Sequence, residues 1–313
     1  MDASRNDTHR SGFCAIVGRP NVGKSTLLNR VLGQKIAIVT PKPQTTRNRI
    51  LGVLTLPHAQ VAFLDTPGIH RARGGLNRYM VDQALGAIEE VDVVLFLVEP
   101  PRRATPEEVR RPPGDVEQSI VRRLRAAKKK VILGINKVDA ISKPLLLPMI
   151  DAWSERYDFA SIVPFSALTG DGVDILVNAV VDELPEGPRL FPEDVVTDLA
   201  ERTITAEFVR EQILRHTHEE VPYGTAVVVE SFDESERDGR NLVRIQARIY
   251  VERESQKGIL IGKRGEMLKK IGTDARREIE RLLGSRVFLG LEVVVEPRWS
   301  ERREALRRLG YAE

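Results

Sequence analysis

The sequence predicts an α/β domain, with a doubly wound and mostly parallel sheet, followed by a smaller α+β domain. Three observations support this. Short apolar runs alternate with helical patterns from residue 12 to about residue 184. Three prolines then interrupt the chain in "PEGPRLFPED", residues 185–194. After them the pattern changes to helix, strand, strand, short helix, long helix, strand. A chain of 313 residues has room for two such domains.

The composition excludes several classes of protein. The chain is 42% hydrophobic and 30% charged, as is typical of soluble globular domains. It contains no apolar run of about 18 residues, so we expect no membrane span. The N-terminus is polar and lacks the apolar core of a signal peptide, so we predict a disordered tail over residues 1–11. The single cysteine, Cys14, cannot form an internal disulfide, and we expect a cytoplasmic protein.

The strands of the first domain are predicted from near-continuous apolar runs, which suit strands that are covered on both faces. These runs are "FCAIVG", "VAFLDT", "DVVLFLV", "KVILGIN" and "ASIVPFS". Helices are predicted between them at 24–32, 76–90, 115–129, 145–156 and 172–183. A doubly wound sheet binds its ligand at the carboxyl ends of the strands. We assign residues 12–184 to this domain, 185–192 to a linker, and 193–313 to the second domain with a C-terminal helix.

The segment after the first strand, "GRPNVGKST", fits a phosphate-binding loop (P-loop). Two glycines lie five residues apart and are followed by lysine and serine. The glycines let the backbone curl so that its N–H groups point at phosphate oxygens, and the next helix adds its positive end. The lysine can reach the terminal phosphates, and the serine hydroxyl can ligate Mg²⁺. The predicted phosphate-binding residues are Gly18, Arg19, Pro20, Asn21, Val22, Gly23, Lys24, Ser25 and Thr26.

A second motif, "DTPG", ends a later strand. A carboxylate at this position can hold Mg²⁺ through water, and the backbone N–H of the glycine can sense a γ-phosphate. The tetrapeptide alone is also an ordinary turn, but its place behind a phosphate loop favours the nucleotide role. The predicted residues are Asp65, Thr66, Pro67, Gly68 and Ile69.

Two further motifs indicate the base. In "NKVD" an aspartate can accept hydrogen bonds from N1–H and the N2 amine of guanine, which adenine does not offer. A buried polar site left unpaired by the wrong ligand discriminates strongly, so we predict GTP rather than ATP. In "SAL" a backbone N–H can meet guanine O6. The predicted residues are Asn136, Lys137, Val138, Asp139, Ser166, Ala167 and Leu168.

The four motifs, in this order and each at a strand end, resemble those of translation-factor-like GTPases. Between the first two lies "PKPQTTRNR", residues 41–49, which is polar and basic. It suits a switch segment that γ-phosphate and Mg²⁺ order, although a plain surface loop is the alternative. The family pattern places a Mg²⁺-ligating threonine here, for which we prefer Thr46 over Thr45. The predicted metal ligands are Ser25, Thr46 and Asp65.

The resemblance also bears on hydrolysis. Many GTPases carry a water-orienting glutamine directly after the second motif, but here Ile69 occupies that position. We therefore predict slow intrinsic hydrolysis, with the water placed by backbone, by a switch residue or by a partner. Asn21 resembles the residue found in GTPases that use K⁺, which suggests K⁺ as an additional cofactor. The predicted catalytic residues are Asn21, Lys24, Thr46 and Gly68.

A proline-rich patch, "PPRRATPEEVRRPPG", lies inside the first domain at residues 100–114. It contains five prolines and charges of both signs. Proline interrupts both helices and sheets. We predict an exposed insertion without helix or strand, and we assign it no function.

The second domain contains two glycines in a helical context, in "KGILIGKRGEMLKK". A glycine inside a helix costs about 1 kcal/mol relative to alanine, so we predict a turn between two helices with two cations at its tip. The apolar stripe of the following helix is Leu268, Ile271, Ala275, Ile279 and Leu282. The order α-β-β-α-α-β with G-x-x-G between two helices resembles a type II KH domain, whose loop clamps about four single-stranded nucleotides. The predicted RNA-binding residues are Gly262, Lys263, Arg264 and Gly265.

Charge is unevenly distributed over the second half. Residues 191–239 contain 4 Lys and Arg against 13 Asp and Glu, a balance of −9. Residues 240–313 contain 18 Lys and Arg against 11 Asp and Glu, a balance of +7. A basic segment that holds the G-x-x-G loop favours a polyanionic partner, although a solvated helix face with internal ion pairs is the alternative.

Taken together, the chain resembles the Era family of GTPases from about residue 12 to residue 311. The segments that carry the resemblance, in order, are "GRPNVGKST", "PQTTRNRI", "DTPGIH", "NKVD", "SAL", "EEVPYGTAVVVE", "GILIGKRGEMLKKIG" and "WSERREALRRLGY". The resemblance implies a bacterial GTPase that uses GTP/GDP and Mg²⁺, binds the 3′ end of 16S rRNA, and docks on the precursor of the 30S ribosomal subunit to assist its assembly. It also implies peripheral association with the inner membrane. We expect a monomer.

Two alternative functions fit parts of the same sequence. The first alternative is a membrane-associated or cell-cycle signalling GTPase, whose second domain binds protein or lipid. The second is a GTPase that modifies tRNA, which would need a further catalytic module for which no residues remain.

Overall fold

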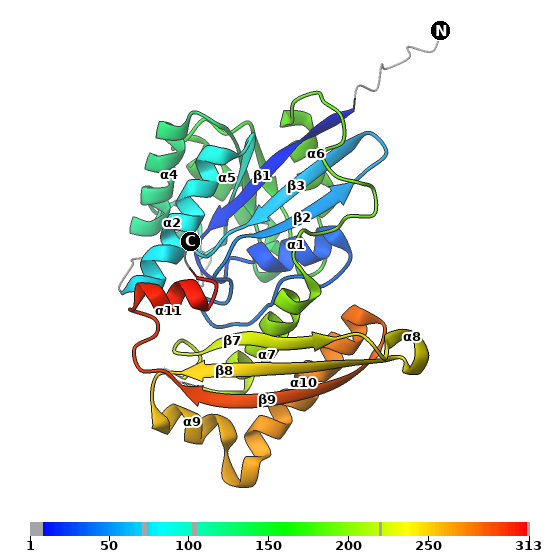
Figure 1. The fold of residues 1–313 in the computed structure, drawn as a ribbon. Helices are drawn as coiled ribbons and strands as arrows, with labels where there is room; N and C mark the ends of the chain where they lie inside the picture. The colour runs from blue at the N-terminus through cyan, green and yellow to red at the C-terminus, as the bar shows by residue number, and fades with distance from the viewer. Residues whose placement is uncertain (1–8, 71–73, 102–104, 219–220, 312–313) are drawn as a thin grey trace. The chain divides into compact units, whose positions relative to one another are not determined.

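The computed structural model describes residues 9–70, 74–101, 105–218 and 221–311 (Figure 1). The described residues form two compact units: 9–36, 46–70 and 80–198 make up the first, and 37–45, 74–79 and 199–311 the second. Residues 1–8 of the predicted disordered tail lie outside the described residues. The end of that prediction is wrong, because the first strand begins at Arg10. The predicted domain limits stay a prediction.

The sheet of the first unit has six strands in the order β2-β3-β1-β4-β5-β6. β2 runs antiparallel to β3, and the other pairs are parallel. The mostly parallel, doubly wound fold is therefore confirmed, and each of the five apolar runs contains a strand. The strands are β1 (Arg10–Gly18), β2 (Ile50–Thr55), β3 (Ala59–Asp65), β4 (Val93–Val98), β5 (Lys130–Ile135) and β6 (Ser161–Pro164).

The five helices predicted for the first domain are present, with ends that differ by up to two residues. The helical elements are α1 (Lys24–Leu32), α2 (Gly75–Glu90), α3 (Pro106–Arg110), α4 (Asp115–Ala127), α5 (Leu146–Ser154) and α6 (Val173–Glu183), with the short 3₁₀ helices η1 (Val138–Ala140) and η2 (Lys143–Leu145). The first turn of α2 groups with the second unit.

Helices cover both faces of this sheet (Figure 1). On one face, side chains of α2, α4 and α5 such as Ala84, Leu124 and Trp153 pack in one apolar cluster with alternate strand residues. α1 and α6 lie on the other face, where Leu28 and Val180 are fully buried. Because β1, β3, β4, β5 and β6 are parallel, their carboxyl ends meet at one edge of the sheet. The loops that carry the four motifs all leave from this edge.

The prediction for the proline-rich patch is wrong in one respect. Within residues 100–114 the structure contains a helix, α3, of five residues. Thr105 caps it, since its side chain accepts a hydrogen bond from the amide of Glu108, and Pro106 occupies the first turn. Proline is tolerated there because the missing N–H would have no partner within the helix. Val109 is buried and anchors the helix in the core.

The second unit contains the predicted order α-β-β-α-α-β, with one additional short helix between its first two strands. The elements are α7 (Glu201–His216), β7 (Ala226–Asp233), α8 (Arg237–Arg240), β8 (Leu242–Val251), α9 (Glu254–Ile261), η3 (Lys263–Gly265), α10 (Glu266–Leu283), β9 (Arg286–Val295) and the C-terminal α11 (Arg303–Arg308). β7 and β8 are antiparallel, and β8 and β9 are parallel.

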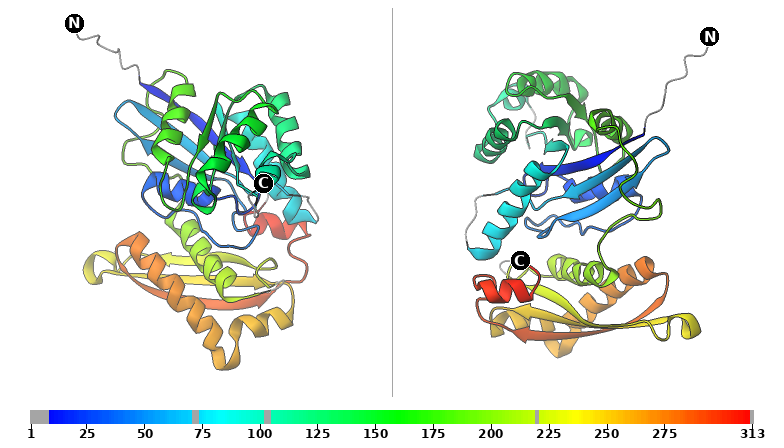
Figure 2. Two further views of the ribbon diagram at one scale, coloured as in Figure 1. Left: turned by 180° about the vertical axis from the view of Figure 1, so that it is seen from behind. Right: turned by 45° about the horizontal axis from the view of Figure 1, so that its top comes forward.

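α7 and α10 lie side by side against the three-stranded sheet (Figure 2, left). The predicted apolar stripe of α10 is confirmed, because Ile271, Ala275 and Ile279 are fully buried and pack with Phe208 of α7 and Ile245 of β8. Leu268 and Leu282 are partly buried at the margin of the same cluster. No helix in the described part of the chain is both long enough and apolar enough to cross a membrane.

Candidate functional site

The predicted phosphate loop joins β1 to the N-terminus of α1. Gly23 (φ 103°) and Asn21 (φ 64°) adopt left-handed conformations that curl the backbone. Lys24 Nζ reaches back across the loop and donates to the Arg19 carbonyl oxygen at 3.1 Å. The side chain of Lys24 is buried. A curled backbone, an enclosed cation and a helix N-terminus together form a cradle for phosphate groups.

Asn136 ties the base-recognition motifs to the phosphate loop. Its Nδ2 donates to the Val22 carbonyl oxygen at 2.7 Å, and its Oδ1 accepts from the Ala167 amide at 2.9 Å. A Cβ atom at Gly23 would lie only 2.2 Å from Asn136 Nδ2, so this approach requires glycine. One buried amide thus brings the first, third and fourth motifs together.

The remaining base-recognition residues lie on either side of Asn136. Lys137 has a φ of 66°, and its Nζ donates to the Asn21 carbonyl oxygen at 2.7 Å and pairs with Glu99. Asp139, in η1, is exposed, so its carboxylate is open to a base. Leu168 is 70% exposed, which leaves an apolar surface beside the "SAL" backbone.

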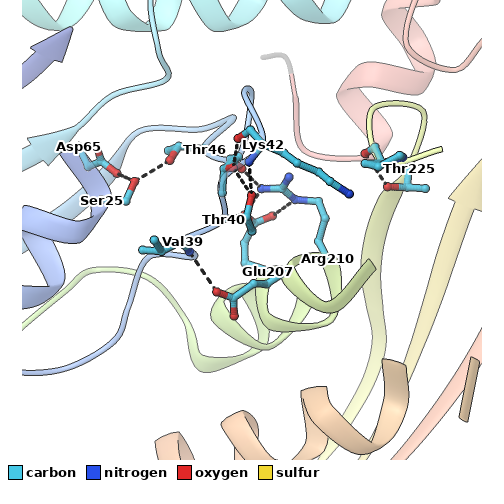
Figure 3. Close-up of polar contacts among 12 residues, drawn as sticks. Ser25, Val39, Thr40, Lys42, Thr46, Asp65, Glu207, Arg210 and Thr225 are labelled. Atoms are coloured by element: carbon cyan, nitrogen blue, oxygen red, sulfur yellow. Dashed lines mark hydrogen bonds and ion pairs between the residues drawn. The ribbon is translucent and has the colours of Figure 1, made fainter. Parts of the chain in front are cut away.

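The predicted metal ligands lie together in the structure (Figure 3). Ser25 Oγ donates to Asp65 Oδ2 at 2.5 Å and lies 2.8 Å from Thr46 Oγ1. Within the described part of the chain, the buried Asp65 Oδ1 receives no hydrogen bond. A buried carboxylate oxygen without a donor is costly, and a cation would satisfy it. Two hydroxyls and a carboxylate are hard oxygen ligands, so these residues fit Mg²⁺.

The electrostatics of the site favour a cation and an anion together. Burial raises the pKa of the Asp65 carboxyl to about 6, although Lys24 and the Ser25 hydroxyl act in the opposite direction. Burial lowers the pKa of Lys24 to about 8, opposed by Asp65. A divalent cation would favour the ionised form of Asp65, and phosphate groups would favour the ionised form of Lys24. The two buried charges therefore suit a metal-bound polyphosphate.

The two candidate switch threonines, Thr45 and Thr46, make different contacts. Thr45 Oγ1 donates to the Lys42 carbonyl oxygen at 2.7 Å and lies 2.8 Å from Thr40 Oγ1, so it closes its own loop. Thr46 instead contacts Ser25 and is 7% exposed. This geometry supports Thr46 as the metal-ligating residue.

The loop after Asp65 approaches the phosphate loop through its backbone. The Ile69 amide donates to the Gly18 carbonyl oxygen at 3.1 Å. A Cβ atom at Gly68 would lie 2.6 Å from Pro20 Cα, so glycine is required at this contact. The Ile69 side chain is buried in the core and offers no polar atom to a water molecule. This placement supports the prediction of slow intrinsic hydrolysis.

Sequence reasoning missed one residue that supports the base-recognition loops. Arg30, in the last turn of α1, donates from Nε to the Ala167 carbonyl oxygen at 3.2 Å and from Nη2 to the Leu168 carbonyl oxygen. It fixes the "SAL" backbone from outside. An arginine at a helix end belongs to no motif, and no signal in the sequence pointed to it.

The predicted turn in the second unit is confirmed in its geometry. η3 connects α9 to α10, and Gly262 (φ 71°) and Gly265 (φ 80°) have left-handed φ values. A Cβ atom at Gly262 would lie 2.7 Å from Met267 Cβ. Both Lys263 and Arg264 are exposed at the tip. The loop thus presents two cations and close backbone access.

A groove of about 860 Å³ starts at this loop and follows α10. Its walls are α10 on one side and the first halves of β8 and β9 on the other. Phe288 is 50% exposed, with the Arg244 guanidinium 5.7 Å from its ring centre. The cationic residues of the groove are Arg244, Lys269, Arg276 and Arg286, and its apolar residues are Leu242, Leu268, Val287, Phe288, Leu289 and Leu291.

The nucleotide motifs and the G-x-x-G fold define the class of this protein: a P-loop GTPase domain joined to a KH domain. Comparison with known families supports both parts. Residues 13–137 match the family described as 50S ribosome-binding GTPase, and residues 220–300 match the KH domain family. The chain belongs to the GTPase Era family, as its full-length relatives show.

Those relatives include two proteins named GTPase Era. The protein from Geotalea daltonii is 56% identical over 96% of this chain and 97% of its own length. The protein from Geobacter metallireducens is 57% identical over 96% of this chain and 98% of its own. The predicted resemblance is therefore confirmed.

Solved structures of Era proteins are similar to this chain over almost its whole length. Era from Aquifex aeolicus, as a variant bound to GDP·AlF₄⁻, matches with a TM-score of 0.89 and 43% identity, covering 97% of this chain and 100% of that one. Era in complex with MgGDPNP and nucleotides 1506–1542 of 16S ribosomal RNA matches with a TM-score of 0.90, at the same identity and coverage. The prediction that the chain is a GTPase is confirmed by this family membership.

Proposed function

We propose that this GTPase is a GTP-timed switch that binds the 3′ end of 16S rRNA and assists maturation and assembly of the 30S subunit. The observation that carries the proposal is the presence, in one chain, of a nucleotide cradle and a basic groove headed by a G-x-x-G loop. The Era structure with 43% identity contains both MgGDPNP and a 16S rRNA fragment. Docking on the 30S precursor and peripheral association with the inner membrane stay predictions, as does the monomeric state.

In the proposed site, the phosphates are bound by the Lys24 ammonium and by backbone N–H groups of residues 18–26, of which Pro20 has none. Ser25, Thr46 and Asp65 would hold Mg²⁺, directly or through water. The metal would neutralise charge on the β- and γ-phosphates. The exposed Asp139 carboxylate accepts from guanine N1–H and N2, while Asn136 fixes the loops around the base.

Hydrolysis in this proposal relies on positioning, because Ile69 supplies no polar group. The Gly68 and Ile69 backbone and Thr46 of the switch segment are left to orient the attacking water. Because Asn21 resembles the residue of GTPases that use K⁺, we include K⁺ in the proposal. The ion would neutralise the transition-state charge that an arginine finger neutralises in other GTPases. We expect hydrolysis to be faster in KCl than in NaCl of equal ionic strength. Equal rates in the two salts would remove K⁺ from the mechanism.

RNA binding is proposed for the groove along α10. The loop Gly262–Gly265 lets a nucleic-acid backbone approach closely, and Lys263 and Arg264 supply charge to its phosphates. The apolar floor and the exposed Phe288 suit unstacked bases, which pack on aromatic and guanidinium planes. Single-stranded RNA fits such a surface better than a duplex, whose bases are already stacked.

Fluorescence anisotropy with a short RNA that carries the 16S 3′-terminal sequence tests the proposal. A scrambled RNA of equal length serves as the control, and sedimentation with anionic vesicles in the same salt series tests the signalling alternative. We expect tight binding to the 16S sequence and weaker binding to the scrambled RNA. Vesicle binding without sequence-dependent RNA binding would contradict the proposal and favour the signalling alternative.

A further inference from the structure

Two adjacent buried charges on α7 hold the backbone of residues 37–45. Arg210 and Glu211 are both 0% exposed. Arg210 Nη2 donates to the Thr45 carbonyl oxygen, and its Nε donates to Glu207 Oε1 at 2.8 Å. Glu211 Oε1 accepts from the Val39 amide at 3.1 Å and from Arg215 Nη2 at 3.0 Å. The two charges thus fix residues 37–45 near both ends.

Neighbouring contacts strengthen this hold. Lys42 Nζ donates to the Thr217 carbonyl oxygen directly after α7. Ile38 is 1% exposed and packs in the same apolar cluster as Ile204 and Phe208 of α7. These contacts explain why residues 37–45 group with the second unit, although the residues before and after them belong to the first.

Apolar packing alone does not explain why Arg210 and Glu211 are buried. Burying a charge is costly, and well-packed apolar side chains of similar volume often stabilise a core as well or better. Here both charges are directed at main-chain atoms of one short loop. Within the described part of the chain, the buried Arg210 Nη1 also lacks a hydrogen-bond partner.

The position of the loop in the chain gives this hold a consequence. Thr45, whose carbonyl oxygen Arg210 binds, is joined by one peptide bond to Thr46, whose hydroxyl lies 2.8 Å from Ser25 Oγ. A residue that fixes the Thr45 carbonyl group also fixes the plane of the next peptide and limits where the Thr46 hydroxyl can lie. Arg210 is therefore linked to the metal-ligating threonine through the backbone.

We propose that Arg210 and Glu211 are positioning residues of the GTPase, which hold residues 37–45 by their backbone so that Thr46 faces the nucleotide site. Through them α7 controls the switch segment and the rate of hydrolysis. The inference rests on the proposed role of Thr46. It assigns to α7, a helix outside the nucleotide motifs, a role in GTP hydrolysis that does not require RNA.

Arg210→Met tests the inference, with Arg202→Met as the matched control. Arg202 is also on α7 and donates to a carbonyl oxygen, but that of Val229 in β7. We expect Arg210→Met to lower kcat without RNA, and to weaken binding of a non-hydrolysable GTP analogue, by about tenfold each, a common size for coupling between sites. GDP has no γ-phosphate, so its affinity should stay within about twofold. Arg202→Met should leave all three values unchanged, and Arg210→Lys should restore part of the loss.

Amide hydrogen exchange supplies a readout besides activity. In Arg210→Met, residues 39–46 should exchange faster while β1, β4 and β5 stay protected, because the loop is released and the core is not. If Arg210→Met fails to fold, Glu211→Leu carries the same test, since the ion-pair partner of Glu211, Arg215, is 47% exposed and stays solvated when the carboxylate is removed. A folded variant with unchanged kcat, nucleotide affinities and loop exchange would overturn the inference.

A Thr46→Ala arm separates failure of the inference from failure of its premise. If Thr46→Ala does not slow hydrolysis, the proposed role of Thr46 is wrong, and no effect of Arg210 can act through it. If Thr46→Ala slows hydrolysis while Arg210→Met and Glu211→Leu do not, the site assignment stands and the positioning role is wrong. Both results are obtained without RNA, so they do not depend on the proposed RNA-binding function.

Discussion

Lys24 is the single residue whose loss should most directly affect nucleotide binding. Its ammonium group is enclosed by the phosphate loop and faces Asp65. Lys24→Ala should cost about 3 kcal/mol of GDP binding, roughly a hundredfold in Kd, because a charged hydrogen-bond donor to phosphate is lost. Titration with a fluorescent GDP analogue measures this. Lys130→Ala is the control, since Lys130 is 67% exposed at the start of β5, away from the motif loops. Equal affinity in both variants would contradict the assignment.

Cys14 should be inert in the folded protein. Its side chain is 0% exposed in β1, and burial raises the pKa of its thiol far above the usual range. The thiolate is the reactive form, so we expect no reaction with a disulfide reagent under native conditions and one equivalent after denaturation in guanidinium. Rapid labelling of the native protein would show that the β1 core opens far more readily than its packing indicates.

The sequence motifs identified which residues form the site, but not which atoms those residues bind. The motif spacing identified Asn136, but not that its amide joins Val22 to Ala167, because partners distant in sequence leave no local pattern. Arg30, Arg210 and Glu211 were missed for the same reason. Each acts on backbone atoms of a loop far from it in the chain, and each would be assigned to a solvated helix face on spacing alone.

The G-x-x-G loop is the element for which a charge change gives the clearest prediction. Replacing both Lys263 and Arg264 with aspartate should weaken RNA binding and reduce the slope of log Kd against log salt by about 2, since two phosphate contacts are lost. Hydrolysis without RNA should not change. Anisotropy over a salt series, together with a phosphate-release assay, measures both effects.

The control for this prediction carries the same change of charge on α10, the helix that follows the loop. Arg277 and Arg281 are 63% and 73% exposed on α10 and are not among the residues that line the groove. Replacing these two with aspartate should leave most of the affinity intact. If both double variants lose affinity equally, the loop is not a specific contact and the effect is one of net charge.

Element prediction succeeded where periodicity was strong and failed where local chemistry decided. The stripe of α10 and the buried strands were predicted because one face or two faces of these elements must be apolar. β2 was not among the predicted strands, because Gly52 interrupts its apolar run. The structure explains this glycine, since a Cβ atom there would lie 2.6 Å from Leu32 Cδ1. α3 was missed because the prolines of the patch around it were taken only as breakers, although Pro106 follows the Thr105 cap and suits the first turn of a helix.

At the scale of the whole molecule, the division into units does not follow the order of the chain. Residues 37–45 and 74–79 group with the second unit although they lie within the first half of the sequence. Both segments flank nucleotide motifs. Composition and the proline-rich join predict two domains, but no sequence pattern indicates that these two segments group with the second unit, because contacts between residues distant in sequence decide the grouping.

The grouping of residues 37–45, which precede the metal-ligating Thr46, with the second unit predicts that the affinities for nucleotide and for RNA are linked. If GTP raises RNA affinity, RNA must raise the affinity for GTP by the same factor, because coupling between two sites is reciprocal. Measuring the GTP-analogue affinity with and without the 16S RNA therefore checks the titrations of RNA against the two nucleotide states. Unequal factors would mean that one of the measurements does not report a binding equilibrium.

The central claim, that GTP times RNA binding, is tested most directly by one comparison. The affinity for the 16S 3′-terminal RNA is measured by anisotropy with the protein saturated first with a GTP analogue and Mg²⁺, and then with GDP and Mg²⁺. We predict tighter binding in the GTP-analogue state, by about tenfold, within the usual range for coupled sites. Equal affinity in the two states would contradict the account, since the protein would then bind RNA and hydrolyse GTP without connecting them.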